Sequence, residues 1–151
     1  MILNNELTDF TFAPEKDRAP VANRVQAGKR PLSSMSPTIV YNSEGKPILA
    51  LGSAGGKRII MHVTKALIGV LDYGLSLEEA MALPNIYYGG SGVLIEKNSQ
   101  LEAVQAELSQ YGHTVVTSGL PSKLAGAQKT EKGWVGAVDP RSIGEAVSEL
   151  P

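Results

Sequence analysis

A glycine-rich junction between an apolar run and a helical pattern places the strongest constraint on how this chain can fold. Residues 47–51 form a strand-like apolar run, and Gly52, Gly55 and Gly56 follow within the segment LGSAGGKR. Glycine lets the backbone turn sharply and lets its N–H groups face a ligand without a side chain in the way. A helix that starts at such a turn adds unpaired N–H donors and the positive end of its dipole. The junction therefore predicts a strand, a tight turn and a helix whose first amides suit an anion or an oxyanion.

Other interpretations of this junction stay open on residue types alone. A phosphate-binding loop requires G-x-x-x-x-G-K-[ST], but Leu51 stands at its first glycine position and Arg58 stands where Ser or Thr is needed. The glycine spacing of a dinucleotide-binding turn is also lacking. A tight strand-to-helix connection that needs glycine only for packing is as well supported as an anion site.

The helical pattern after the junction extends from residue 59 to residue 71. Apolar residues recur there at spacings of three and four, which indicates one buried helical face. Gly74 follows the expected end of the helix, as a C-terminal stop signal should. The apolar stretch is interrupted by His62, Thr64 and Lys65, so it is not interpreted as a membrane span.

The order of elements along the chain indicates an α+β fold with helices on a mainly antiparallel sheet. Strands are expected at residues 38–41, 47–51, 93–96, 114–117, 126–129 and 133–138, and the first two and the last two of these are expected to pair as hairpins. Capping boxes at Ser76–Glu79 and Ser99–Glu102 predict two further helices. Residues 11–31 contain three prolines and are expected to form a long surface loop.

Three smaller expectations concern single segments. An apolar, strand-like start is expected at residues 1–5, and Asp139-Pro140-Arg141 is expected to form a turn with a salt bridge. Tyr73 is expected to pack in the core or at its edge.

Composition narrows the chemistry that these segments can perform. The chain has 151 residues, of which 42% are hydrophobic and 19% charged, so it is expected to fold as one domain. The absence of cysteine excludes disulfides, thiolate metal sites and a cysteine nucleophile. The two histidines, His62 and His113, have no partner at motif spacing and are expected to be structural. The net charge of −1 gives no indication of a nucleic-acid or anionic-membrane partner, and no signal peptide is visible.

Two short polar segments could recognise a charged ligand. Ser33 and Ser34 stand between two prolines just before a strand, where rigidly held hydroxyls could donate hydrogen bonds to a carboxylate. Glu6 and Asp9 are three residues apart, so a turn could bring both carboxylates to one ammonium group. Residue types alone favour an ordinary polar loop and solvated acids at these places.

Five segments occur along the chain in a specific order: LNNELTDF, KRPLSSMSPT, LGSAGGKRI, LDYGLSLEEAMALP and GAVDPRS. In that order they resemble the small subunit of the γ-glutamyltranspeptidases, and the resemblance extends over essentially the whole chain. It implies an N-terminal nucleophile hydrolase with a four-layer αββα sandwich. The chain would then be the C-terminal portion of the small subunit, a single incomplete domain over residues 1–151 that lacks the N-terminal strands and the large subunit.

The resemblance implies an activity as well as a fold. Members of this family cleave γ-glutamyl amides such as glutathione through a γ-glutamyl-threonine intermediate and pass the glutamyl group to an amino acid, a peptide or water. No metal or organic cofactor is implied. The implied partners are the γ-glutamyl donor, the acceptor and the large subunit of the same precursor. Family resemblance also points to the periplasm or the outside of the cell.

The resemblance assigns roles to four side chains. Ser33 and Ser34 would bind the α-carboxylate of the donor, since hydroxyl groups donate hydrogen bonds to carboxylates. Asp9, with Glu6 beside it, would bind the α-ammonium group of the donor through charge-assisted hydrogen bonds.

The resemblance also assigns a role to the glycine turn. The N–H groups of Gly55 and Gly56 would form the oxyanion hole. The nucleophilic threonine of the family precedes the LNN segment and is not found in this sequence, so no catalytic residue is assigned and the chain alone is expected to be inactive. Two alternatives stay open. One is a non-catalytic glutamyl-binding remnant, and the other is an enzyme of the same superfamily that acts on a cephalosporin-type acyl group or on poly-γ-glutamate.

Overall fold

The computed structural model describes residues 5–148 of the chain. The chain divides into two compact units, residues 1–34 and residues 35–151, and each is described by itself. The strand-like start expected at the N-terminus lies outside the described residues, apart from Asn5.

The first unit contains little regular structure. A short 3-10 helix, η1 (Glu6–Asp9), is followed by a small antiparallel hairpin of β1 (Glu15–Lys16) and β2 (Ala19–Pro20). The two residues in the turn of this hairpin both have positive φ angles. The long surface loop expected over residues 11–31 is therefore confirmed, with one tight hairpin inside it.

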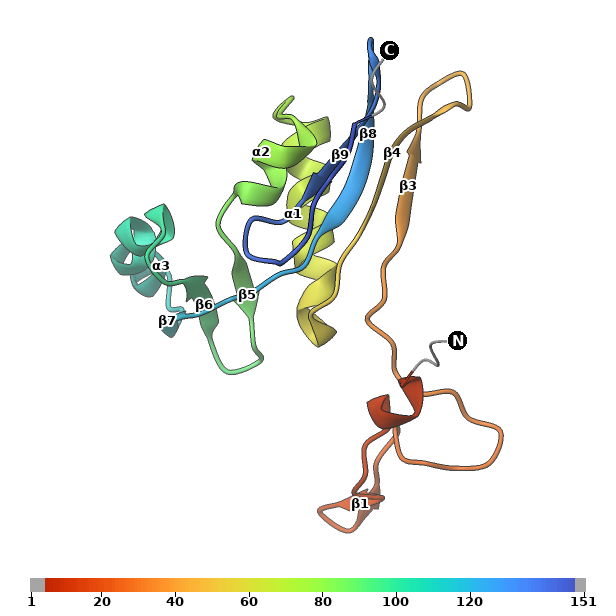
Figure 1. The fold of residues 1–151 in the computed structure, drawn as a ribbon. Coiled ribbons are helices and arrows are strands. Elements are labelled where there is room, and N and C mark those ends of the chain that lie inside the picture. Colours follow the sequence, from red (N-terminus) through yellow and green to blue (C-terminus); the bar gives the residue numbers. More distant parts are fainter. Residues whose placement is uncertain (1–4, 149–151) are drawn as a thin grey trace. The chain divides into compact units, whose positions relative to one another are not determined.

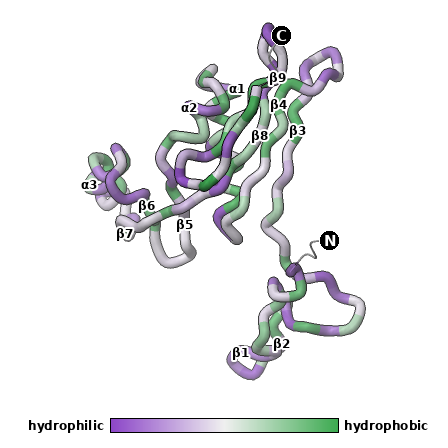
Figure 2. Tube along the Cα trace, viewed as in Figure 1, coloured by the Kyte–Doolittle hydropathy of each residue, from purple (hydrophilic) through white to green (hydrophobic). Residues whose placement is uncertain are grey.

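A four-stranded antiparallel sheet forms the centre of the second unit (Figure 1). Its strands, in spatial order, are β3 (Thr38–Tyr41), β4 (Pro47–Gly52), β8 (Ala125–Thr130) and β9 (Gly133–Val138). Figure 2 shows hydrophobic residues along β3, β4 and β9. Both hairpins expected from the sequence are thereby confirmed, and the pairing of β4 with β8 joins them into one sheet.

Two helices cover one face of this sheet. A 3-10 turn, η2 (Gly56–Arg58), leads into α1 (Ile59–Leu71), and α2 (Leu77–Ala82) packs against α1. A Cβ atom on Gly69 would lie 2.8 Å from the Cβ atom of Ala80, so this glycine permits the close approach of α1 and α2. The buried core consists of Leu49, Leu51, Ile59, Val63, Ala66, Leu77, Met81, Leu124 and Ala137.

A smaller mixed sheet completes the second unit. It contains, in spatial order, β5 (Ile86–Tyr88), β6 (Val93–Glu96) and β7 (Val115–Ser118). The pair β5–β6 is antiparallel and the pair β6–β7 is parallel. The parallel connection passes through η3 (Gln100–Val104) and α3 (Gln105–Gln110). No helix within residues 5–148 has the length and apolar character needed to cross a membrane.

The α+β class expected from the sequence is confirmed, and several local expectations are corrected. The strand β5 was not predicted. The capping box at Ser76 is confirmed, but the Glu102 side chain accepts a hydrogen bond from the Asn98 amide rather than from Ser99. Tyr73, expected to be at least partly buried, is 73% exposed.

Candidate functional site

The turn between β4 and α1 has a backbone that only glycine adopts readily. Gly55 has a φ angle of 145° and Gly56 has a φ angle of 59°, both in the region that L side chains rarely enter. Gly56 is the first residue of η2, which continues directly into α1. The strand, tight turn and helix predicted from the sequence are therefore confirmed.

Hydrogen bonds fix both sides of this turn and leave its amides available. The Ala54 amide donates to the Lys123 carbonyl at 3.4 Å, and the Arg58 amide donates to the Gly55 carbonyl at 3.3 Å. Within residues 5–148, neither Gly55 nor Gly56 donates a backbone hydrogen bond. Unpaired amides at a helix start, with the positive end of the helix dipole, suit an anion or a developing oxyanion.

The acidic pair of the first unit lies on η1. Residues three apart in a 3-10 helix lie on the same face, so Glu6 and Asp9 project from one side of η1. Asp9 is exposed and Glu6 is partly buried. The structure thus places both residues on one face of η1, and their binding of an ammonium group stays a prediction.

The serine pair lies in an irregular segment at the end of the first unit. The side chain of Asn23, which the sequence analysis did not single out, connects this segment to η1. The amide group of Asn23 donates to the Asp9 carbonyl at 2.7 Å, and its Oδ1 accepts from the Leu32 amide at 2.9 Å. One side chain therefore holds the ends of two segments, one with Asp9 and the other with Ser33 and Ser34. No local pattern marks Asn23, because the partners of its side chain lie between nine and 14 residues away.

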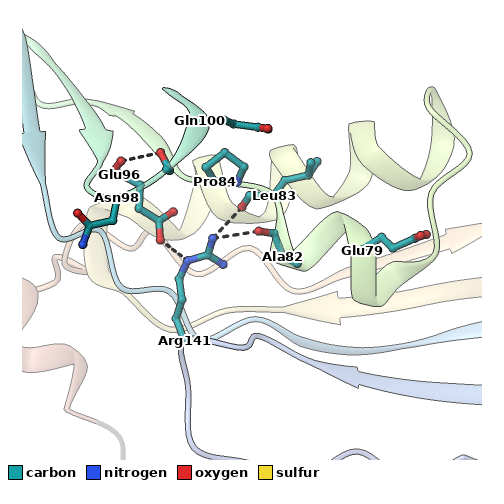
Figure 3. A pocket seen from close by; sticks show the side chains of 9 residues that line it. Glu79, Ala82, Leu83, Pro84, Glu96, Asn98, Gln100 and Arg141 are labelled. Carbon is teal, nitrogen blue, oxygen red and sulfur yellow. Dashed lines mark hydrogen bonds and ion pairs between the residues drawn. The ribbon is translucent and has the colours of Figure 1, made fainter. Parts of the chain in front are cut away.

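A second polar cluster, centred on Arg141, closes the C-terminal end of α2 (Figure 3). Nε of Arg141 donates to Glu96 at 2.5 Å, and Nη1 donates to Asp139 at 3.1 Å. Its guanidinium also donates to the carbonyls of Met81, Ala82 and Leu83. The turn with a salt bridge expected at Asp139-Pro140-Arg141 is confirmed, and its position at a helix end makes it a structural clamp.

Burial and hydrogen bonds shift the pKa values of two charged groups in and beside this cluster. Burial alone would raise the pKa of Asp139, but hydrogen bonds from the Ser122 hydroxyl and from Arg141 hold that pKa below its usual value. Lys65 on α1 donates to the carbonyls of Met81 and Leu83, and burial lowers its pKa to about 8. The pocket beside the cluster is lined by Glu79, Ala82, Leu83, Pro84, Glu96, Asn98, Ser99, Gln100 and Arg141.

A metal-binding site is not found in the described part of the chain. Among residues 5–148, no three histidine, aspartate or glutamate side chains are grouped as metal ligands would be. The candidate residues of the first unit are the acidic pair and the serine pair, and the candidate feature of the second unit is the glycine turn.

Comparisons with known proteins cover nearly the whole chain. Residues 1–149 match the sequence model of the family described as Gamma-glutamyltranspeptidase. A relative, the glutathione hydrolase proenzyme of Bacillus subtilis strain 168, is 40% identical over 118 residues. The match covers 78% of this chain and 19% of that protein, so the chain spans about a fifth of the length of this relative.

Solved structures give the same result. An acivicin-inhibited gamma-glutamyltranspeptidase superposes with a TM-score of 0.80 and 34% identity, over 95% of this chain and 81% of the matched chain. The T380A mutant of the Helicobacter pylori gamma-glutamyltranspeptidase superposes with a TM-score of 0.78 and 36% identity, over 93% and 81% of the two chains.

Proposed function

Because the chain belongs to the gamma-glutamyltranspeptidase family, we propose that it is part of an enzyme that cleaves γ-glutamyl amides such as glutathione. The glutamyl group then passes to an amino acid, a peptide or water. This chain supplies the donor-binding segments and the oxyanion turn, and none of its residues is assigned as the nucleophile. Its partner is the large subunit of the same precursor, which the proenzyme name of the Bacillus subtilis relative supports.

The proposal rests above all on two hydrogen bonds between the Asn23 side chain and the main chain. They hold the segment with Asp9 to the segment that leads into Ser33 and Ser34. A γ-glutamyl donor carries an α-ammonium and an α-carboxylate on one carbon atom. A site that recognises both groups needs acidic side chains for the ammonium and hydroxyl groups for the carboxylate, held at a fixed separation.

Recognition of the donor is divided between the two polar pairs. Ser33 and Ser34 donate hydrogen bonds from their hydroxyls to the α-carboxylate, and such bonds to a charged group are stronger than neutral ones. Asp9, with Glu6 on the same face of η1, accepts hydrogen bonds from the α-ammonium. Together they select a free α-amino acid head on the donor.

The reaction consists of two acyl transfers that share one oxyanion site. A threonine hydroxyl attacks the γ-carbonyl carbon, and its proton passes through the α-amino group of that threonine to the leaving amine. The acceptor amine or water then attacks the resulting ester, and the threonine hydroxyl regains its proton. In both steps the carbonyl oxygen becomes an oxyanion, which the amides of Gly55 and Gly56 stabilise.

Replacing both serines tests the proposal in the active, full-length enzyme. Ser33→Ala with Ser34→Ala removes two hydrogen bonds to a charged group, each worth roughly 1.5–3 kcal/mol. We expect KM for a chromogenic γ-glutamyl anilide to rise and kcat/KM to fall about a hundredfold or more. Steady-state kinetics with the anilide as the varied substrate measures both quantities.

A third serine in the same segment provides the control. Ser36→Ala changes a hydroxyl two residues beyond the pair and is expected to leave the KM of the donor within about twofold of the wild-type value. If the double variant and Ser36→Ala show the same donor kinetics, the carboxylate assignment is wrong.

A further inference from the structure

His62 lies against the glycine turn, on the buried face of α1. It is 2% exposed. A Cβ atom built on Gly55 would lie 3.2 Å from Cε1 and 3.4 Å from Nδ1 of His62. The edge of the imidazole therefore occupies the space that a side chain at position 55 would need, and it packs against the residue whose φ angle of 145° defines the turn.

One polar atom of the His62 side chain is buried without a hydrogen-bond partner in the described part of the chain. Nδ1 of His62 has no hydrogen-bond partner among the described residues. Burying a polar atom without a partner costs folding free energy, so such atoms are rare in folded proteins. An apolar side chain of similar volume would fill the same space without that cost. Packing alone therefore does not account for a histidine at this position.

The surroundings of His62 favour the neutral imidazole. Burial is the largest influence, and it lowers the pKa of His62 below its usual 6.5. The charged groups that act on the imidazole are Lys65 on α1, Arg58 on η2, and Asp139 and Arg141 in the segment after β9. Of these, only Asp139 favours the protonated form. Three cations and burial together outweigh one carboxylate, so the side chain is neutral at pH 7.

We propose that His62 is a positioning residue for the oxyanion turn: as a neutral imidazole it holds Gly55 in place, and on protonation it releases the turn. This inference rests on the proposed function, because the oxyanion role of the turn is part of that proposal. A protonated imidazole in this place requires solvation, since a buried charge without a partner is costly. The ring then moves away from Gly55, and the turn loses its support.

The expected consequence is an effect on kcat rather than on KM. An oxyanion exists only in the transition states and intermediates of acyl transfer, so a misplaced amide affects the chemical steps and not the binding of the donor. His62→Leu preserves an apolar volume and His62→Asn preserves a polar atom, and neither side chain can be protonated. Both variants test whether the turn depends on a titrating imidazole.

Kinetics of the full-length enzyme gives the first test. For both His62 variants we expect kcat for a γ-glutamyl anilide to fall about tenfold at pH 8, with KM changed less than about twofold. The acid side of the wild-type kcat profile should have a midpoint below pH 6.5 that is lost or displaced in both variants. His113→Asn alters an exposed histidine and should leave the profile unchanged. Variants of His62 with wild-type kcat and a wild-type pH profile would overturn the inference.

A measurement without substrate separates this inference from the proposed function. In wild-type protein labelled with ¹³C at histidine Cε1 and ¹⁵N at glycine, the His62 signal is identified by its loss in His62→Asn. We expect the amide signals of Gly55 and Gly56 to shift with the same pH midpoint as His62. Chemical shifts of Gly55 and Gly56 that do not change as His62 titrates would overturn the positioning role, whatever the enzyme catalyses. Signals that follow it in a protein without γ-glutamyl activity would support His62 as the support of the turn and refute the proposed function instead.

Discussion

Residues 5–34 and residues 35–148 differ in what holds each of them in shape. Among residues 5–34 only Phe10 is buried, and the two segments proposed to bind the donor are joined by the polar side chain of Asn23. Residues 35–148 contain helices packed on a sheet around a buried core, with a clamp of charged groups at Arg141. Substitutions of polar residues should therefore alter donor binding in the first region and the free energy of unfolding in the second.

Removing the buried carboxylate of Asp139 should have the largest effect. Asp139 is 0% exposed and accepts hydrogen bonds from Ser122, from the backbone amide of Arg141 and from the guanidinium of Arg141. Asp139→Ala leaves these donors without their acceptor, so we expect the free energy of unfolding to fall by about 3 kcal/mol. Denaturant unfolding followed by circular dichroism measures the change.

An exposed ion pair provides the control for Asp139. Glu44 and Lys46 are 2.8 Å apart, with side chains 66% and 73% exposed. Glu44→Ala should change the free energy of unfolding by less than about 1 kcal/mol, because solvent screens an exposed pair. Equal losses in Asp139→Ala and Glu44→Ala would contradict the view that the buried clamp stabilises the second region.

Removing the Asn23 side chain should have an intermediate effect, and this effect should be on the KM of the donor. Asn23→Ala removes the side-chain hydrogen bonds to the Asp9 carbonyl, the Thr11 hydroxyl and the Leu32 amide, each worth about 1 kcal/mol. About half of this loss should appear in donor binding, so we expect KM for the γ-glutamyl anilide to rise about tenfold. The denaturation midpoint of the core should not change. Steady-state kinetics and denaturant unfolding of the same protein check both statements.

A second asparagine gives a matched comparison. The Oδ1 atom of Asn42 accepts from the amides of Glu44 and Lys46 in the β3–β4 turn, which is the same chemistry within the second region. Asn42→Ala should lower the free energy of unfolding by about 1 kcal/mol and leave the donor KM unchanged. A reversal, with Asn23 affecting stability and Asn42 affecting KM, would break the comparison between the two regions.

Lys65 should produce the smallest effect, visible as a dependence of stability on pH. Burial lowers its pKa to about 8 in the folded protein, from 10.5. Between these pH values the unfolded chain holds a proton that the folded chain has lost, so the Lys65 contribution to the free energy of unfolding rises with pH. Relative to Lys65→Met, the wild type should gain about 1 kcal/mol from pH 7 to pH 10, a value reduced by solvent screening. A difference between the two proteins that stays constant with pH would refute the lowered pKa.

Local patterns in the sequence predict the elements whose signals are local. The Asn/Gly turn and two apolar runs predict the β3–β4 hairpin, and the recurrence of apolar residues predicts α1. In contrast, β5 has only three residues and exists through its pairing with β6, which no local pattern encodes. The parallel pairing of β6 with β7 is likewise a property of the fold rather than of either segment.

The candidate site shows the same division. The turn at Gly55 and Gly56 could be predicted because a glycine sequence at a strand end limits the backbone to few conformations. Asn23 could not be predicted, since its role comes from contacts with Asp9 and Leu32 across the loop. His62 was expected to be structural, and its further role is inferred from the packing of its ring against Gly55 and from its buried Nδ1, which has no hydrogen-bond partner among the described residues.

The proposed recognition of the donor α-carboxylate by Ser33 and Ser34 can be tested with a substrate that lacks this carboxylate. The full-length enzyme and its Ser33→Ala, Ser34→Ala variant would be assayed with a γ-glutamyl anilide and with a 4-aminobutanoyl anilide, which keeps the amine but has no α-carboxylate. We expect the double substitution to lower kcat/KM about a hundredfold for the γ-glutamyl anilide and to change it less than about twofold for the other substrate. An equal loss with both substrates would contradict the proposed recognition.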